Sequence, residues 1–247
     1  MGSSMKTIAL AAALAGGLYA ARKYYRNWGT TKQECRMRLP GDELVGDPVV
    51  QATEAVWIDA PSSAIWPWLP QMGQYRGGLC GYQAIGNLAG LDIHNADQLR
   101  PEWQRLAVGD VVRVGPYGWL GLPDGLVLRV AEIVPERHIV LFGSVPNRPW
   151  GMVWSVHIRP HWEHGGRLLI RIRVALRKPG QVLGMELARP AISLAVRGIL
   201  LGIKRRVEQE QRGHASTAKV RHDELAAQPA PNTVPATGQA LGEHHTT

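Results

Sequence analysis

The chain has 247 residues, 45% of them apolar, which is enough for one large domain or two small ones. The net charge of +8 and the pI near 9.9 favour anionic partners such as lipid head groups, although a soluble surface that is simply basic fits equally well. No zinc-finger spacing or basic zipper occurs, so nucleic acid is not an expected partner. Only two cysteines are present, Cys35 and Cys80, so neither a disulfide framework nor a thiolate metal site is expected.

An unbroken apolar run opens the chain, from Ile8 to Ala21. As a helix it spans about 21 Å, against about 30 Å for the hydrocarbon core of a bilayer, and the tyrosines and basic residues that flank it can extend to the interface. It predicts a membrane-anchor helix over residues 1–26. The basic cluster Arg22–Arg26 then places the following domain in the cytoplasm. A cleaved signal peptide and a plain amphiphilic N-terminus are the alternatives.

Pro and Gly punctuate residues 27–48, which we interpret as a connector. A domain over residues 49–212 follows. Its first strand, Val49–Ile58, alternates and places Val50, Ala52, Val56 and Ile58 on one face. Short helices are predicted after Pro61 and over residues 82–88, with a glycine-rich loop between them.

Five further strands are predicted, over residues 111–114, 126–134, 139–142, 150–160 and 167–176. The last two alternate cleanly, as in an antiparallel sheet with one dry face. We expect Met152, Trp154, Val156 and Ile158 on that face, opposite Leu168, Ile170, Ile172 and Val174. His157, Arg159, Arg171 and Arg173 would form an outward basic patch, either solvated or resting on anionic head groups.

A period of three and four residues then predicts a long helix. Its apolar stripe is Ile192, Val196, Ile199, Ile203 and Val207, widened by Leu187, Leu194 and Leu201. Pro190 suits the first turn of this helix. Residues 213–247 are polar without an apolar period and predict a disordered tail.

This order of elements resembles the helix-grip fold of the SRPBCC (START-like, polyketide cyclase/dehydrase-like) superfamily, in an uncharacterised bacterial branch. The resemblance covers about Trp28 to Arg206 and rests on local motifs. These are Thr53–Ile58 running into Asp59-Ala60-Pro61, Ile65-Trp66-Pro67-Trp68-Leu69, Gln71-Met72-Gly73, Arg76-Gly77-Gly78, Asn87-Leu88-Ala89-Gly90-Leu91, Asp92-Ile93-His94-Asn95-Ala96-Asp97, Pro101-Glu102-Trp103-Gln104 and Val108-Gly109-Asp110. It implies an α+β fold, with a curved antiparallel sheet wrapped around a long C-terminal helix, and members that bind or process hydrophobic molecules. Related sequences carry an aromatic-rich segment after Arg-Gly-Gly, whereas only Tyr82 keeps that character here.

The predicted function is binding or carrying of an apolar, lipid- or polyketide-like small molecule between the sheet and the C-terminal helix, at the membrane. The predicted lining residues are Tyr82, Met152, Trp154, Val156, Ile158, Leu168, Ile170, Ile172, Ile192, Val196 and Ile199. A filled core in a non-catalytic interaction protein is an alternative. No cofactor, metal ligand or catalytic residue is predicted, and the oligomeric state is open.

An aromatase- or cyclase-type enzyme is the other alternative, and it needs inward polar groups. Glu132 shares its parity with Leu126, Leu128 and Val130, although it also fits the exit of its strand. His94 lies in a titratable cluster that is either a base with its carboxylate or a loop with side-chain caps.

Overall fold

The computed structural model describes residues 26–81, 94–119, 122–144, 151–161, 165–176 and 178–226, with a few isolated positions before residue 18. The chain divides into two compact units, Met1–Gln211 and Arg212–Thr247. Among the described residues, no helix combines the length and apolarity needed to cross a bilayer. The predicted anchor over residues 1–26 lies largely outside them.

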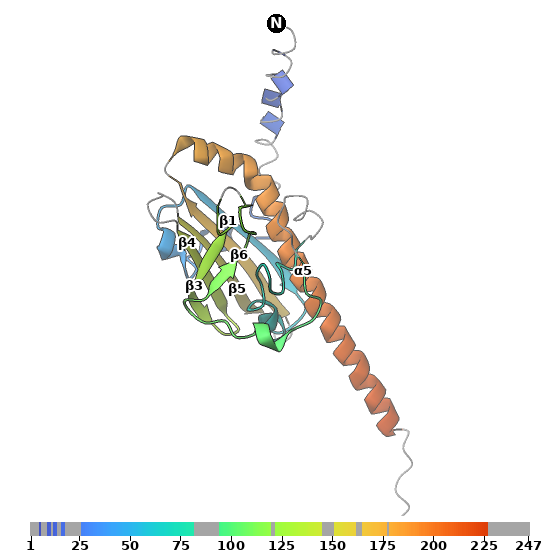
Figure 1. Cartoon of the computed structure of the whole chain (residues 1–247). Coiled ribbons are helices and arrows are strands. Elements are labelled where there is room, and N and C mark those ends of the chain that lie inside the picture. Colours follow the sequence, from blue (N-terminus) through green and yellow to red (C-terminus); the bar gives the residue numbers. More distant parts are fainter. Residues whose placement is uncertain are drawn as a thin grey trace, which may run out of the picture. The chain divides into compact units, whose positions relative to one another are not determined.

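Six antiparallel strands form one sheet (Figure 1). They are β1 (Val50–Ile58), β2 (Val111–Arg113), β3 (Val127–Val134), β4 (His138–Ser144), β5 (Gly151–His161) and β6 (Gly165–Ala175). The spatial order β1-β6-β5-β4-β3-β2 makes the last five strands a meander and adds β1 beside β6. All six predicted strands are confirmed, to within two residues at each end.

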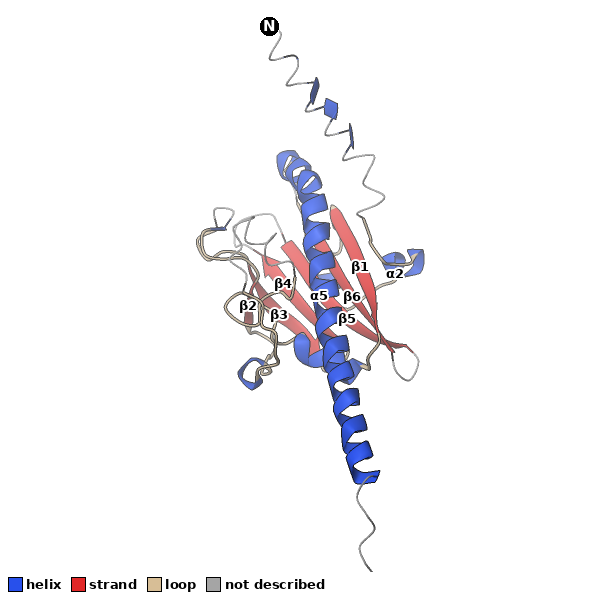
Figure 2. Ribbon diagram, turned by 90° about the vertical axis from the view of Figure 1, so that its right-hand side faces the viewer, coloured by secondary structure: helices blue, strands red, loops and turns tan. Residues whose placement is uncertain are grey.

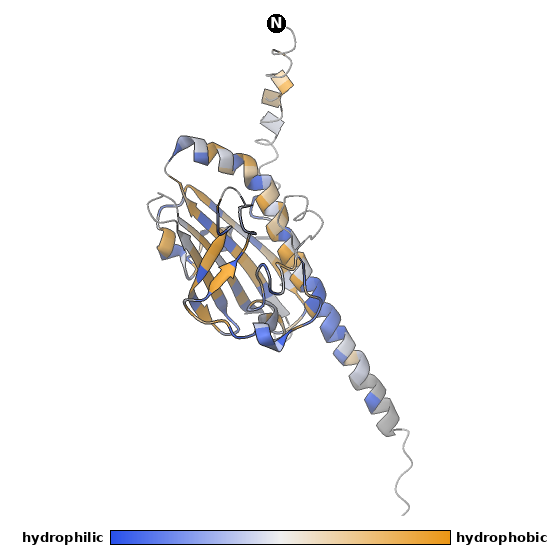
Figure 3. Ribbon diagram, viewed as in Figure 1, coloured by the Kyte–Doolittle hydropathy of each residue, from blue (hydrophilic) through white to orange (hydrophobic). Residues whose placement is uncertain are grey.

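The helix α5 (Pro179–Ala226) crosses one face of this sheet, as Figure 2 shows. Its buried residues join the inward residues of the strands in one apolar core, and Figure 3 shows hydrophobic residues on both elements. The residues that α5 contributes are Val196, Ile199, Leu200, Ile203 and Val207. A sheet with one dry face needs such a cover, so this is the helix-grip fold predicted from the sequence.

Two details of α5 differ from the prediction. The helix begins at Pro179, so Pro190 lies inside it, not in its first turn. An interior proline removes a helical hydrogen bond and kinks the helix, and Figure 1 shows the first turns of α5 at an angle to the rest. Leu187 and Leu194 are 54% and 39% exposed and do not widen the stripe. Leu194 stands two residues, about 200°, from the buried Val196, and therefore faces away from the sheet.

At its other end, α5 continues to Ala226, so residues 213–226, which we expected in a disordered tail, are helical. Alanine, lysine, arginine, glutamate and leucine in this stretch are good helix formers. Residues 227–247 lie outside the described part, where disorder stays a prediction.

The shorter elements precede the sheet strands or connect them. They are α2 (Lys32–Arg36), η1 (Asp42–Val45), α3 (Ser62–Ile65), η2 (Trp66–Trp68) and η3 (Pro101–Trp103). Thr31 begins α2 with a capping box, because its side chain accepts from the Glu34 amide while the Glu34 carboxylate accepts from the Thr31 amide.

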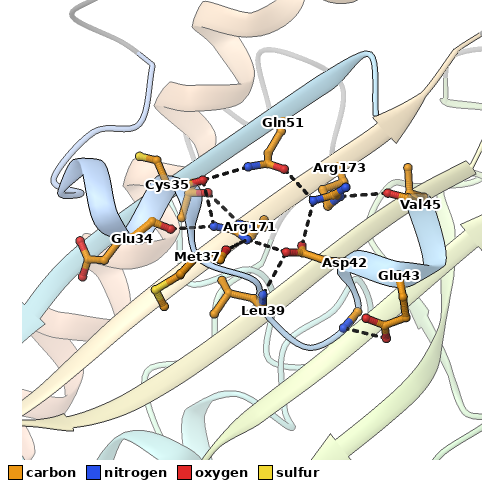
Figure 4. Close-up of polar contacts among 12 residues, drawn as sticks. Glu34, Cys35, Met37, Leu39, Asp42, Glu43, Val45, Gln51, Arg171 and Arg173 are labelled. Carbon is orange, nitrogen blue, oxygen red and sulfur yellow. Dashed lines mark hydrogen bonds and ion pairs between the residues drawn. The ribbon is translucent and has the colours of Figure 1, made fainter. Parts of the chain in front are cut away.

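The segment expected as a connector, residues 27–48, packs against the outer face of the sheet through buried ion pairs. Arg171 is fully buried and donates to Thr53 Oγ1 at 2.9 Å and to Asp42 Oδ2 at 2.7 Å. It also donates to the carbonyl oxygens of Glu34 and Met37, as Figure 4 shows. Because every direction of the guanidinium finds an acceptor, this segment is held on the sheet as part of the domain.

Two neighbouring arginines complete this arginine network. Arg167 donates to both carboxylate oxygens of Glu34 at 2.9 Å, and this hydrogen bonding holds the pKa of Glu34 at about 2. Arg173 lies 3.3 Å from Asp42 Oδ1 and donates to Val45 O. The predicted outward basic patch is therefore wrong. Arg171 and His157 are buried, and Asp42 of the covering segment forms ion pairs with Arg171 and Arg173, whereas Arg159 is exposed.

Candidate functional site

The register of the sheet brings the predicted lining residues together. Trp154 pairs with Ile172, Val156 with Ile170, and Ile158 with Leu168, all on the face that α5 covers. Each such pair forms part of a row of residues that runs across the strands. On β1 these rows continue to Ala52, Glu54 and Val56. Tyr82 is the one predicted lining residue outside the described part of the chain.

Burial divides these residues into two groups. Those deep in the sheet are at most 6% exposed: Trp154, Val156, Ile158, Leu168, Ile170, Val196 and Ile199. Met152, Ile172 and Ile192 are only partly buried, and so is Ala52, the partner of Ile172 on β1. The partly buried group lies where β5 begins and β6 ends, so this end of the interior is the more accessible one.

Glu54 is a buried polar residue of this interior that is not among the predicted lining residues. It shares its parity with Val50, Ala52 and Val56, so its side chain points inward, where it is 2% exposed. The alternation of β1 was itself the signal, because Glu54 occupies an apolar position of the pattern.

Among the described residues, the Glu54 carboxyl has one hydrogen-bond partner. Ser193 on α5 donates its hydroxyl to Oε1, while Oε2 is buried and has no hydrogen-bond partner among the described residues. Burial raises the pKa of Glu54 to about 7, against the opposing effects of the Ser193 hydrogen bond and the Arg197 charge. The carboxyl is therefore present in both protonation states at neutral pH.

A polar seam joins α5 to β1 on either side of this carboxyl. Arg189, Ser193 and Arg197 recur every four residues and so share one side of the helix. Arg189 donates to the Gln51 carbonyl at 3.2 Å, and the Arg197 guanidinium lies 4.7 Å from the ring centroid of Trp28. The seam fixes the helix against the edge strand and holds Ser193 over Glu54.

A second buried polar atom on the inner face also lacks a partner. Trp154 is 3% exposed, and no described residue accepts a hydrogen bond from its Nε1. It stands one row from Glu54 and two strands away, which corresponds to about 12 Å between Cα atoms. Buried polar atoms are nearly always hydrogen-bonded, so each of these two indicates a partner outside the described protein atoms.

Glu132, considered for an inward catalytic role, does not point inward. A bulge between Val130 and Glu132 shifts the register, so Glu132 pairs with Val140 on the outer face. There it lies 2.9 Å from Nε2 of His138. Simple parity failed here because a bulge adds one residue to a strand and reverses the faces that follow.

The predicted titratable cluster around His94 is a structural loop in its described part, residues 94–97. Asn95 accepts from the Leu79 amide and donates to the Gly81 carbonyl, which is the side-chain capping considered as an alternative. Arg206 of α5 then binds Ala96 O and Asp97 Oδ1, whereas His94 is exposed. Asp92 and Ile93 lie outside the described residues. Within the described ranges, no three His, Cys, Asp or Glu side chains are placed to hold one metal ion.

Fold and site together define a helix-grip protein in which the buried acid Glu54 lies on the inner, mainly apolar face of the sheet. No family model and no curated protein matches the chain. Similar solved structures include CalU16 from Micromonospora echinospora, with 14% identity over 69% of this chain and 88% of that one, at a TM-score of 0.33. DynU16 from the dynemicin biosynthetic locus shares 12% identity over 64% of this chain and 47% of its own, at 0.36.

A third similar structure is SA2116 from Staphylococcus aureus, a protein of unknown function, with 8% identity over 66% of this chain and 97% of its own, at a TM-score of 0.42. These identities and TM-scores are low, so the fold assignment depends on the strand order and on the position of α5. Membership of the SRPBCC superfamily, and of one bacterial branch within it, stays a prediction.

Proposed function

We propose that the chain binds an apolar small molecule between the sheet and α5, and that its N-terminal segment holds it at a membrane. The observation that carries the proposal is that two of the buried polar atoms without described partners, Glu54 Oε2 and Trp154 Nε1, lie on the mainly apolar inner face of the sheet. A buried polar atom left without a hydrogen bond costs about 1–3 kcal/mol. A ligand with oxygen atoms at these two points would remove that cost.

Partly buried residues of the inner face would contact the apolar part of the ligand. Met152, Ile172 and Ile192 come from three elements and are only partly buried, although they belong to the inner face. A ligand that covers them gains about 25 cal/mol for each Å² of apolar surface removed from water. Entry from this end, where β5 begins, leads along the partly buried Ala52 and Ile172 toward Glu54.

The membrane part of the proposal depends on the sequence. The apolar run from Ile8 to Ala21 with its basic flanks supports an anchor, and the net charge of +8 supports contact with anionic lipid. An apolar ligand is poorly soluble in water, so a binding protein held at a bilayer would meet it where it is concentrated.

Native mass spectrometry of the full chain, released from mild detergent after incubation with a bacterial lipid extract, tests the binding. We expect a one-to-one adduct on the wild-type chain. In Ala52→Leu, three added carbon atoms occupy the accessible end of the interior, and the adduct should fall about fivefold while the melting temperature changes little.

Ala195→Leu is the matched control, because Ala195 is exposed on α5 and the same change there adds no volume to the interior. An adduct that persists equally in both variants would place the ligand elsewhere. No adduct at all would favour the packed core of an interaction protein. The enzyme alternative loses the support of Glu132 and His94, which lie on the outer face and the surface.

A further inference from the structure

We propose that Glu54 and Ser193 recognise a hydroxyl group of the bound molecule, so that the ligand class is an apolar alcohol or phenol. This inference rests on the proposed function and names the chemistry of the same site. Two observations carry it: the carboxyl is 2% exposed, and only one of its two oxygens has a partner in the described protein.

The arrangement leaves one oxygen of the Glu54 carboxyl, Oε2, without a hydrogen bond from the described residues. The Ser193 hydroxyl occupies Oε1, and the strand partner of Glu54 is the buried, apolar Ile170. The carboxyl oxygen that can still form a hydrogen bond is Oε2. Among the described residues no group donates to Oε2, although the Arg197 charge is near enough to act on the carboxyl. A ligand group at Oε2 would complete the site.

The protonation of Glu54 selects the ligand group. A neutral carboxylic acid donates a hydrogen bond from Oε2, whereas a carboxylate accepts one, and both forms are present near pH 7. A hydroxyl both donates and accepts, so it fits either form. An ether or ketone fits only the acid, and an ammonium only the carboxylate. The charged α5 residues beside the site are the arginines Arg189 and Arg197.

The spacing of residues along the strands sets the length of the expected ligand. From Met152 at the accessible end to the row of Glu54 is four residues along the strands, about 13 Å. Ala52 and Ile172 form the row between them and are partly buried. A hydroxyl at Glu54 with an apolar body of about this length therefore reaches the accessible end.

The experiment compares two probes of equal size on the full chain, held in solution by an amphipathic polymer. Decan-1-ol and its isomer 1-methoxynonane compete for the apolar fluorophore N-phenyl-1-naphthylamine, and only the alcohol donates a hydrogen bond. At pH 8, where Glu54 is mostly ionised, the wild-type chain should prefer the alcohol about tenfold, the equivalent of one good hydrogen bond. At pH 5, where Glu54 is neutral, the preference should vanish.

Glu54→Gln tests the assignment to this residue. Its amide group keeps the shape, accepts from Ser193 and donates to alcohol and ether alike, so the preference should be absent at both pH values. Glu54→Leu should behave in the same way, and it serves as the second variant if one of the two does not fold. Glu102→Gln changes an exposed carboxylate and should retain the pH-dependent preference.

The outcomes separate the two proposals. A preference that survives in Glu54→Gln, or a wild-type chain that binds both probes equally at pH 8, overturns the hydroxyl inference and leaves ligand binding intact. If neither probe displaces the fluorophore, or if Ala52→Leu binds it as the wild-type chain does, the ligand-binding proposal itself fails.

Discussion

At the residue scale, Glu54 makes the stability of the domain depend on pH. Its pKa is about 7 in the folded chain, against an ordinary value of 4.5. The folded state therefore holds this proton more tightly than the unfolded state does. Between pH 4.5 and pH 7, rising pH removes stability, and the loss is complete above pH 7. The difference of the two pKa values corresponds to roughly 3 kcal/mol.

Glu54→Gln should remove this dependence, because an amide does not titrate. We expect the variant to gain stability relative to the wild-type chain as pH rises from 4.5 to 7, by up to about 3 kcal/mol, with no further change above that range. Urea unfolding at pH 4, 6 and 8 measures it. A constant difference between the two proteins would show that Glu54 has an ordinary pKa.

Comparison with the wild-type chain is necessary because other groups act in the same range. Burial lowers the pKa of His157 to about 3, so its contribution rises with pH between about 3 and its ordinary 6.5 and opposes that of Glu54. Glu34 contributes only at lower pH, since its stabilisation is lost as pH falls from 4.5 through about 2. Both are unchanged in the variant and cancel in the difference.

Single residues also show where sequence reasoning stopped. Met152, Trp154, Val156 and Ile158 were placed on the correct face, because strict alternation has only one interpretation in a sheet. Glu54 is not among the predicted inward residues, although alternation along β1 places it on the same face as Ala52 and Val56. Arg171 was placed correctly on the other face, but alternation does not reveal that a distant segment covers that face.

At the element scale, α5 approaches the loop that contains Cys80 as closely as backbone allows. A Cβ at Gly202 would collide with the Cys80 carbonyl oxygen, and Arg206, one turn later, donates to the same oxygen at 3.3 Å. Gly81 also packs against Ile199 of the helix. Cys80 itself has a positive φ of 57°, so the loop is held in a conformation that few residues adopt freely.

Gly202→Ala should therefore destabilise the domain by about 1–3 kcal/mol, because the added methyl group pushes the helix from the loop. Gly184→Ala is the matched control on the same helix, where nothing lies within 4 Å of the added Cβ. That change should stabilise by up to about 1 kcal/mol through helix propensity. Thermal unfolding of both variants measures the contrast, and equal effects would contradict the close approach.

Elements were predictable where one physical pattern dominated. All six strands and the long helix follow from periods of two and of about 3.6 residues. The bulge before Glu132 was not predictable, because one extra residue leaves no mark in the composition of β3. The prediction for Pro190 is wrong because proline is common in first turns, whereas here α5 begins upstream of it at Pro179.

At the scale of the whole molecule, the N-terminal anchor stays a prediction with a direct test. The full chain, expressed in a bacterial host, should remain in the membrane pellet after an alkaline wash. Leu10→Arg combined with Leu14→Arg should release it, because each central charge costs roughly 2.5–3.5 kcal/mol on insertion. The intact mass of the recovered wild-type chain distinguishes the anchor from a signal peptide, since cleavage would remove the first residues.

The covering of β1 by residues 27–30 protects the outer edge of the sheet. β1 is an edge strand, and on its open side the Ala55 amide donates to Trp28 O while the Thr53 amide donates to Asn27 Oδ1. Gly29 adopts a φ of 72° and lies so close that a Cβ there would strike the Ala55 carbonyl oxygen. This short segment thus occupies the open hydrogen-bonding edge of β1, as an additional strand would.

A version of the chain shortened to begin at Val49 would lose that protection. Its β1 edge would present unpaired amides and carbonyls to other copies, and Arg171 would lose Asp42 and the backbone carbonyls that bind it. Such a fragment would be prone to aggregate through strand addition, even with every residue of the apolar interior intact. The smallest unit that can be handled in isolation therefore begins before Asn27, well upstream of the first strand.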